Sequence, residues 1–334
     1  MLSEYLLFLA KTLTWVGAVL VVTFGVLALL RRGREPSGKG RLEVTDLAAE
    51  LRAMGELLDA AMVPPRQRRA LRRAARRARD RRPDLHRKRI FVLNFFGDLQ
   101  ATGVAALRHE VTALLARARQ DDEVVVRLES AGGLVHAYGL AASQLDRIAA
   151  AGIRLTVCVD KVAASGGYLM ACVADQILAA PFAVLGSIGV AAQIPNIHRL
   201  LKRHDVDIEL LTAGEYKRTL TVLGENTDAG REKFQRDLDT VHDLFKQHVA
   251  LRRPGLDIAA VATGEVWLGT RALAMGLVDR IQTSDEYLAG LVAGDAAVYE
   301  LRYRRRMSWR QRLGLAGDSE VRWWTRGREP QLPM

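Results

Sequence analysis

The chain has 334 residues, of which 49% are hydrophobic and 26% charged, and its formal net charge at pH 7 is +11. This length accommodates a membrane anchor plus one sizeable or two small domains. Residues 66–89 hold 13 basic and 2 acidic side chains, so they account for the whole net charge and the remainder is formally neutral. The excess of basic residues is therefore local. The net charge gives no reason to expect that the rest of the chain binds nucleic acid.

An N-terminal membrane anchor is expected over residues 1–34. Residues 12–30 form a 19-residue run without a charge, long enough to cross the hydrocarbon core as a helix. Arg31, Arg32 and Arg34 follow, and no small-residue cleavage site precedes them, so we interpret the run as uncleaved and single-pass. A buried core helix is the alternative. Basic residues after the run outnumber those before it, and the positive-inside rule then favours a cytoplasmic position for the rest of the chain.

Residues 35–89 are interpreted as a helical, arginine-rich juxtamembrane region. Apolar residues recur at helical spacing over residues 45–62, and Pro64-Pro65 ends that segment. Near a membrane the arginines that follow would attract anionic headgroups, at about 1 kcal/mol per basic residue close to the surface. A solvated linker and an RNA-binding arm remain alternatives. Because no aromatic side chains interleave the arginines, nucleic acid is the weakest of the three.

The folded body is expected over residues 90–304, as an α/β domain. Apolar runs predict strands at residues 90–96, 123–130, 153–159, 176–179 and 188–193, alternating with helical runs that include 104–117 and 135–150. This alternation favours βαβ crossovers and a largely parallel sheet. A long helix is expected between Thr227-Asp228 and Pro254-Gly255, and a further helix precedes a last strand near residues 299–303. The tail, residues 305–334, mixes tryptophans with arginines, which suits a membrane interface or a subunit contact.

Two strands are each followed by glycine pairs and a helix. The strand at 153–159 leads through Ala163-Ala164 to Ser165-Gly166-Gly167 and an apolar helical run. A serine in such a strand-to-helix turn is lifted from the backbone, and the N–H of Gly166 points toward the atom that its hydroxyl attacks. The strand at 123–130 is followed in the same way by Gly132-Gly133. By itself Ser-Gly-Gly is also an ordinary turn and helix cap, so the pair of motifs carries the prediction.

Four ordered motifs resemble the S49 serine peptidases, the signal peptide peptidase A family, over nearly the whole chain. They are residues 128–138, 160–168, 186–190 and 212–219. The resemblance implies a crotonase/Clp-like ββα spiral, which periodicity cannot distinguish from a doubly wound sheet. It also implies peptide substrates, such as remnant signal peptides, an inner-membrane location in bacteria and a homo-oligomer. Ala131 departs from the pattern, since such proteins often carry proline there.

The resemblance implies a Ser/Lys dyad. Ser165 would be the nucleophile, Lys217 the general base, Ser187 the hydroxyl that orients the lysine amine, and Gly132 and Gly166 the backbone donors to the oxyanion. A lysine acts as a base only when neutral, so its pKa must fall from about 10.4 to near 7 or 8, which burial among apolar groups can cause. No metal, nucleotide or other cofactor is implied.

Other assignments stay open. Lys161, four residues before Ser165, is a rival base, and His136 is a histidine near Gly132 without an obvious carboxylate partner. Tyr168 is interpreted as a core residue, as are Cys158 and Cys172, whose spacing indicates neither a metal site nor a disulfide framework. Two other classes of function remain: a crotonase- or Clp-like acyl hydrolase, which would need no neutral lysine, and a non-catalytic membrane scaffold, which would be indifferent to Ser165.

Overall fold

A largely parallel sheet runs through the body of the protein, in a computed structural model that describes residues 15, 40–64 and 87–304. Residues 42–304 form one compact unit. The expected anchor apart from Trp15, most of the arginine-rich stretch and the C-terminal tail lie outside the described residues. Within the described ranges, no helix combines the length and the apolar character needed to cross a membrane.

The main sheet has the strand order β1-β10-β2-β3-β4-β6-β9. Its strands are β1 (Arg41–Asp46), β2 (Arg89–Gly97), β3 (Glu123–Ser130), β4 (Arg154–Val159), β6 (Gln176–Ala179), β9 (Arg280–Ile281) and β10 (Ala297–Arg304). From β10 to β9 every neighbouring pair is parallel. Val92, Val125 and Val126 are fully buried in adjacent strands, as near-continuous apolar runs in a sheet covered on both faces require.

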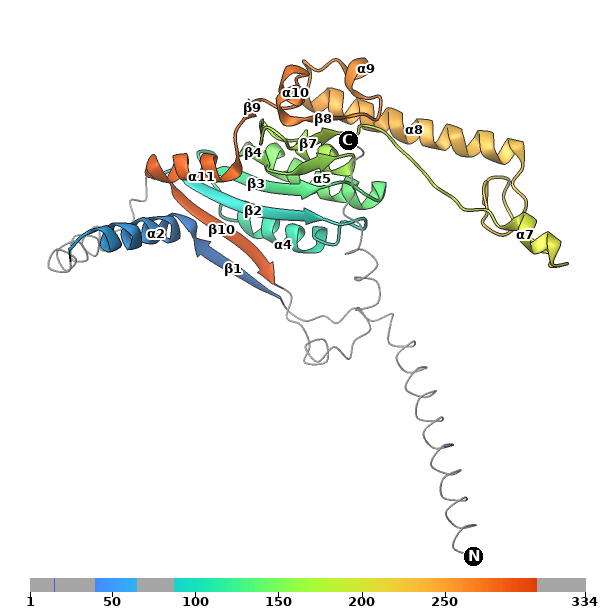
Figure 1. The fold of residues 1–334 in the computed structure, drawn as a ribbon, viewed down its shortest axis with the longest axis horizontal. Coiled ribbons are helices and arrows are strands. Elements are labelled where there is room, and N and C mark those ends of the chain that lie inside the picture. The colour runs from blue at the N-terminus through green and yellow to red at the C-terminus, as the bar shows by residue number, and fades with distance from the viewer. Residues whose placement is uncertain (1–14, 16–39, 65–86, 305–334) are drawn as a thin grey trace, which may run out of the picture. The chain divides into compact units, whose positions relative to one another are not determined.

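Helices cover the two faces of this sheet (Figure 1). On one face, α4 (Val104–Leu115) and α5 (Val135–Ala150) join the large core cluster. On the other, α11 (Ser284–Ala293) and the start of α2 (Leu47–Met62) pack through Leu288 and Ala48 against a smaller cluster. The α5 bounds match the predicted helix, because its apolar residues recur three and four positions apart along one buried face.

A second, smaller layer branches from β3. It consists of β5 (Val162–Ala164), β7 (Val184–Gly186) and β8 (Val266–Leu268), with β5 paired to β3 at Ser130↔Ala163 and to β7 in parallel. The order β4, β5 and then α6 (Gly166–Ala171) is a ββα unit. The strand predicted at residues 188–193 is wrong. The strand in this region is β7, and the left-handed backbone of Ser187, with φ of 51°, ends its pairing.

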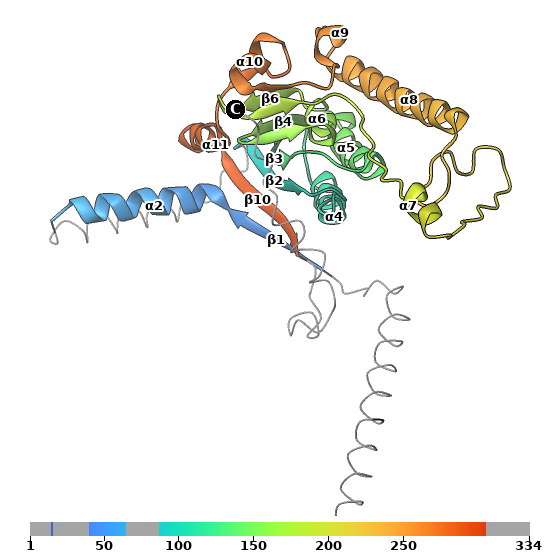
Figure 2. The same cartoon turned by 45° about the vertical axis from the view of Figure 1, so that its right-hand side comes forward.

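A projecting arm (residues 191–227) connects β7 to the long helix α8 (Asp228–Arg252) and contains α7 (His198–Arg203). Figures 1 and 2 both show α7 near the N-terminal end of α8, away from the sheet. The C-terminal part of α8 contacts α6, and two short helices follow it, α9 (Ile258–Val261) and α10 (Gly269–Ala274). The expected long helix is confirmed, with Thr227 as a cap whose side chain accepts from the N–H of Gly230.

Candidate active site

The predicted strand–serine–helix turn is present between β5 and α6. Ser165 has φ of 50° and ψ of −118°, a conformation that costs a non-glycine residue on the order of 1–3 kcal/mol. Its N–H donates to the Gly186 carbonyl at 2.8 Å, and its carbonyl accepts from the N–H of Leu169 at 2.9 Å. A Cβ at Gly166 would overlap the Tyr138 ring, so only glycine fits behind the serine. The surrounding structure therefore holds Ser165, which is partly buried, in a strained turn.

A second strained turn lies beside the first. Ser187 has φ of 51°, and its N–H donates to the Glu265 carbonyl at 2.6 Å. Gly186 has φ of 98° with the Trp267 ring against it, so a Cβ there would lie 2.6 Å from the ring. Because the Ser165 N–H is bonded to Gly186, one residue before Ser187, the structure brings the two predicted serines to neighbouring positions at the ends of β5 and β7.

Gly132 packs directly on the turn formed by residues 164–166. Its φ is 92°, and a Cβ there would lie 2.7 Å from the Gly166 nitrogen and 2.8 Å from the Ser165 Cβ. Its own N–H donates to Ser130 Oγ at 3.1 Å. Among the hydrogen bonds of residues 87–304, none uses the N–H of Gly133 or of Gly166. Of the three glycines, Gly133 and Gly166 therefore keep an N–H without a partner in these residues, whereas the N–H of Gly132, expected from the sequence to be a donor to the oxyanion, is bonded to Ser130.

A groove of about 990 Å³ opens at these turns. Ser165, Gly166 and Ser187 lie along it, together with Gly132 and Gly133, and one face each of α5 and α8 forms its walls. The volume is at the upper end for ligand pockets. Its walls are mainly apolar, and they include Leu134, Leu169, Val190, Leu238 and Phe245. An extended peptide with apolar side chains has the dimensions and chemistry to fit.

Lys217 is not brought to this groove in the single chain. It is absent from the described residues that line the groove, and its side chain is exposed. The preceding Tyr216 ring lies 5.3 Å from the Lys233 ammonium, so this part of the arm lies beside the first turns of α8. The alternatives do not line the groove either: Lys161 pairs with Glu129 at 3.2 Å on the surface, and His136 is exposed on α5.

Two histidines that the sequence analysis did not single out line the groove. His242 places Nε2 3.2 Å from the Ile188 carbonyl, next to Ser187. His248 is partly buried near Asp146, and burial, which disfavours the cation, lowers its pKa. His242 lies four positions after Leu238 and three before Phe245, and His248 lies three positions after Phe245, a helical spacing that could have revealed them.

Tyr168 and the two cysteines are core residues, as interpreted from the sequence. The Tyr168 hydroxyl donates to the Leu277 carbonyl at 2.9 Å, and burial raises its pKa. Burial also raises the pKa of each thiol, Cys158 and Cys172, to about 12. In the described part of the chain, no cluster of His, Cys, Asp or Glu is arranged to hold a metal ion.

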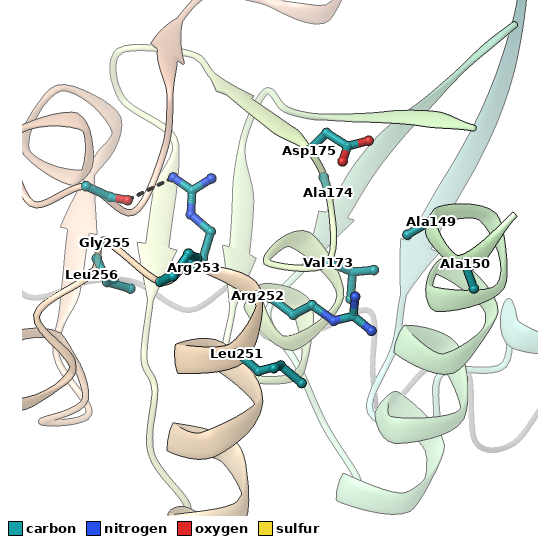
Figure 3. Close-up of a pocket in the computed structure, with 12 residues that line it drawn as sticks. Ala149, Ala150, Val173, Ala174, Asp175, Leu251, Arg252, Arg253, Gly255 and Leu256 are labelled. Atoms are coloured by element: carbon teal, nitrogen blue, oxygen red, sulfur yellow. Dashed lines mark hydrogen bonds between the residues drawn. The ribbon is translucent and has the colours of Figure 1, made fainter. Parts of the chain in front are cut away.

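A separate pocket of about 690 Å³ lies where α5 and α8 end (Figure 3). Arg253 donates to Asp279 at 2.7 and 2.9 Å and to the Gly276 carbonyl at 3.0 Å, and Arg252 pairs with Asp146. Both guanidinium groups are thus neutralised by carboxylates. The residues that line this pocket include neither a serine nor an unpaired guanidinium group, so the groove at Ser165 is the candidate active site.

Comparison with known proteins agrees with the geometry. Residues 1–145 match the peptidase family S49 N-terminal region, and residues 147–297 match peptidase family S49. The chain is 55% identical over 232 residues to a probable protease SohB of Haemophilus influenzae, covering 70% of this chain and 65% of that protein. It is 57% identical over 199 residues to a probable protease SohB of Buchnera aphidicola subsp. Schlechtendalia chinensis, covering 60% and 65%.

The match thus spans about 65% of the length of these relatives. A solved structure, the 1510-N membrane-bound stomatin-specific protease, is 12% identical and aligns with a TM-score of 0.40, covering 61% of this chain and 85% of that one. The family matches together extend from residue 1 to residue 297, apart from residue 146. The chain belongs to peptidase family S49.

Proposed function

We propose that the protein is a serine endopeptidase with Ser165 as its nucleophile. The observation that carries this proposal is the strained Ser165 turn, which faces a peptide-sized groove beside two backbone N–H groups that have no partner in residues 87–304. Donors placed where charge develops in acyl transfer contribute about 3–4 kcal/mol each. Gly166 and Gly133 supply these donors, and Gly132, which has no side chain, lets the two turns approach each other closely.

Lys217 is the proposed general base. Serine needs a base before it attacks an amide, and a lysine serves only when it is desolvated and neutral. In the single chain Lys217 is exposed on the arm, so the arm must place it in a groove to complete the dyad. Ser187, beside Ser165, would then orient the amine through its hydroxyl.

A homo-oligomer gives the arm a place to dock. The arm exposes many large apolar side chains, which is unusual for a surface that stays in water. They include Leu200, Val206, Leu210, Leu211 and Tyr216. Seating them on another copy would bury this surface and desolvate Lys217 in one step.

The reaction then follows the two-step course of acyl transfer. Ser165 Oγ attacks the peptide carbonyl carbon while its proton passes to Lys217 Nζ, and the carbonyl oxygen becomes an oxyanion held by the two glycine N–H groups. The C–N bond breaks, the leaving amine takes the proton, and an acyl ester remains on Ser165. Water, deprotonated by the same lysine, attacks the ester carbon; the C–Oγ bond breaks, the carboxylic acid product leaves, and the lysine returns the proton to Ser165 Oγ.

The membrane is the proposed setting. The uncharged run at residues 12–30 would anchor the chain in a bacterial inner membrane, and the basic stretch would contact anionic headgroups. The flanking arginines favour a cytoplasmic body. Membership of peptidase family S49 and the proposed anchor favour membrane-associated peptides, such as remnant signal peptides, as substrates. Alkaline phosphatase fused after Met334 should be inactive, and high phosphatase activity would contradict this orientation.

The proposed fold is a crotonase/Clp-like ββα spiral, which the order β4, β5, α6 followed by β6 and β7 supports. That relationship keeps an acyl hydrolase as the second candidate, since such an enzyme would use the same two donors without a neutral lysine. Turnover of a peptide against a thioester substrate separates the two enzymes.

Labelling by a fluorophosphonate probe tests the proposal against a non-catalytic scaffold. The full chain should be labelled, and Ser165→Ala should not. Equal labelling of both proteins would mean that Ser165 is not the nucleophile.

A further inference from the structure

A chain of three hydrogen bonds ends at the glycine turn. The N–H of Gly132 donates to Ser130 Oγ at 3.1 Å, Ser130 Oγ lies 2.6 Å from the Tyr138 hydroxyl, and that hydroxyl donates to the Asp98 carbonyl at 2.8 Å. Ser130 is 1% exposed and Tyr138 is fully buried. Water therefore does not compete for these partners, and losing one leaves a buried polar group unsatisfied.

The direction of every proton in this chain is fixed. The Asp98 carbonyl only accepts, so Tyr138 must donate its single proton to it. The Tyr138 oxygen then accepts from Ser130, and Ser130 Oγ is left to accept from the Gly132 N–H. Only this arrangement of protons satisfies all the groups, and it fixes the orientation of the backbone peptide bond between Ala131 and Gly132.

These two hydroxyls lie where strands β2, β3 and β5 meet. Ser130 is the residue at which β3 pairs with both β2 and β5, through Gly97 and Ala163. A Cβ at Gly97 would overlap both hydroxyls, and a Cβ at Gly167 would overlap the Ser130 carbonyl. The Tyr138 ring packs in turn against Gly166. The two hydroxyls are thus enclosed by Gly97, and the Tyr138 ring lies against the turn that carries Ser165.

We propose that Ser130 and Tyr138 are positioning residues that hold the Gly132-Gly133 turn in register with Ser165, so that the Gly133 N–H meets the oxyanion. This inference rests on the proposed function of Ser165 as the nucleophile. Both hydroxyls have protein partners, so they act through the peptide bonds of the glycine turn, residues 131–133. Their contribution belongs to the transition state, where the oxyanion forms, more than to substrate binding.

The chain offers a matched control for this idea. Tyr168 is also fully buried, and its hydroxyl also donates to a backbone carbonyl, that of Leu277, but it has no hydrogen bond to the glycine turn. Tyr138→Phe and Tyr168→Phe therefore each remove one buried hydroxyl of the same kind. Only the first opens the chain that ends at Gly132.

The experiment compares the two variants and Ser130→Ala in the full chain. For Tyr138→Phe we expect kcat on a fluorogenic peptide to fall about tenfold or more, since loss of one oxyanion donor costs about 10²–10³-fold. Affinity for a peptide aldehyde, whose adduct carries the oxyanion, should fall by the same factor, and KM should change less than about twofold. Ser130→Ala should act in the same direction. Tyr168→Phe should lower the thermal midpoint by a similar amount as Tyr138→Phe and keep its kcat.

Three results would overturn the inference. Wild-type kcat in Tyr138→Phe or in Ser130→Ala would show that the hydroxyls do not set the donor. An equal loss of kcat in Tyr138→Phe and Tyr168→Phe would show a general effect of a lost buried hydroxyl. Wild-type protein that a fluorophosphonate does not label at Ser165 would overturn the proposed function as well, and this result is distinguishable because it appears before any variant is made.

Discussion

Gly132→Ala tests whether the glycine turn lies against the nucleophile as described. The new methyl would lie 2.7 Å from the Gly166 nitrogen, 2.8 Å from the Ser165 Cβ and 2.9 Å from the Ala164 carbonyl oxygen, so backbone must move. Overpacking of this kind costs about 1–3 kcal/mol. The φ of 92° adds about 1–2 kcal/mol for a residue with a Cβ. The expected loss in the free energy of unfolding is therefore about 2–5 kcal/mol.

The consequence for activity is larger under the proposed mechanism, because the displaced atoms belong to the turn that holds Ser165 and the N–H of Gly166. A misplacement of about 1 Å costs about 10²-fold in rate, so we expect kcat to fall by at least that factor. The thermal midpoint should fall by roughly 10 °C, at about 2–4 °C per kcal/mol. Gly290→Ala is the control, since it lies inside α11 with open space around its Cβ position, and it should stabilise the protein by up to about 1 kcal/mol. Wild-type kcat and thermal midpoint in Gly132→Ala would refute the described packing.

Three further predictions concern the dyad, the thiols and a histidine. Ser165→Ala and Lys217→Ala should each abolish peptidase activity, and mixing the two inactive proteins should restore part of it if a neighbour's arm supplies the lysine; a mixture that stays inactive would contradict assembly between copies. Cys158 and Cys172, whose pKa values burial raises to about 12, should resist iodoacetamide at pH 8 until the protein is denatured; rapid alkylation of the folded protein would contradict their burial. Burial lowers the pKa of His248, so the unfolded chain binds the proton more readily and stability should fall as the pH drops below about 6.5. His248→Gln should flatten that slope between pH 7 and 5, and an unchanged slope would assign it to another group.

The longer elements could be predicted because each buries one face over many residues. The α5 helix is 16 residues long and α8 is 25, lengths over which helical spacing is unmistakable. The strands β5, β7 and β8 have three residues each, too few for any period to show. The strand predicted at residues 188–193 failed for a related reason. Its apolar residues look extended, but the left-handed conformation of Ser187 depends on a hydrogen bond to Glu265, far along the chain.

Some features of the candidate site could likewise be predicted from the local sequence, and others depend on the fold. Ser165 was visible because its turn is local, a short strand followed by serine and two glycines. Which glycine N–H is free to act as the proposed donor depends on the orientation of the backbone. The N–H of Gly132 is not free, because it donates to Ser130 Oγ. The sequence pattern treats the two neighbouring glycines alike, so it could not separate Gly132 from Gly133.

The distance between the arm and the groove has a chemical consequence under the proposed mechanism. The single chain holds the parts that stabilise an oxyanion, but its proposed base is exposed to water on the arm. Because Lys217 does not line the groove in the single chain, Ser165 has no proposed base beside it there and stays a weak nucleophile. Docking of the arm would bury the arm's apolar side chains and strip water from Lys217 in the same event. Proteolytic activity would then appear only with assembly, so its dependence on protein concentration should be steeper than first order at dilutions where the assembly dissociates.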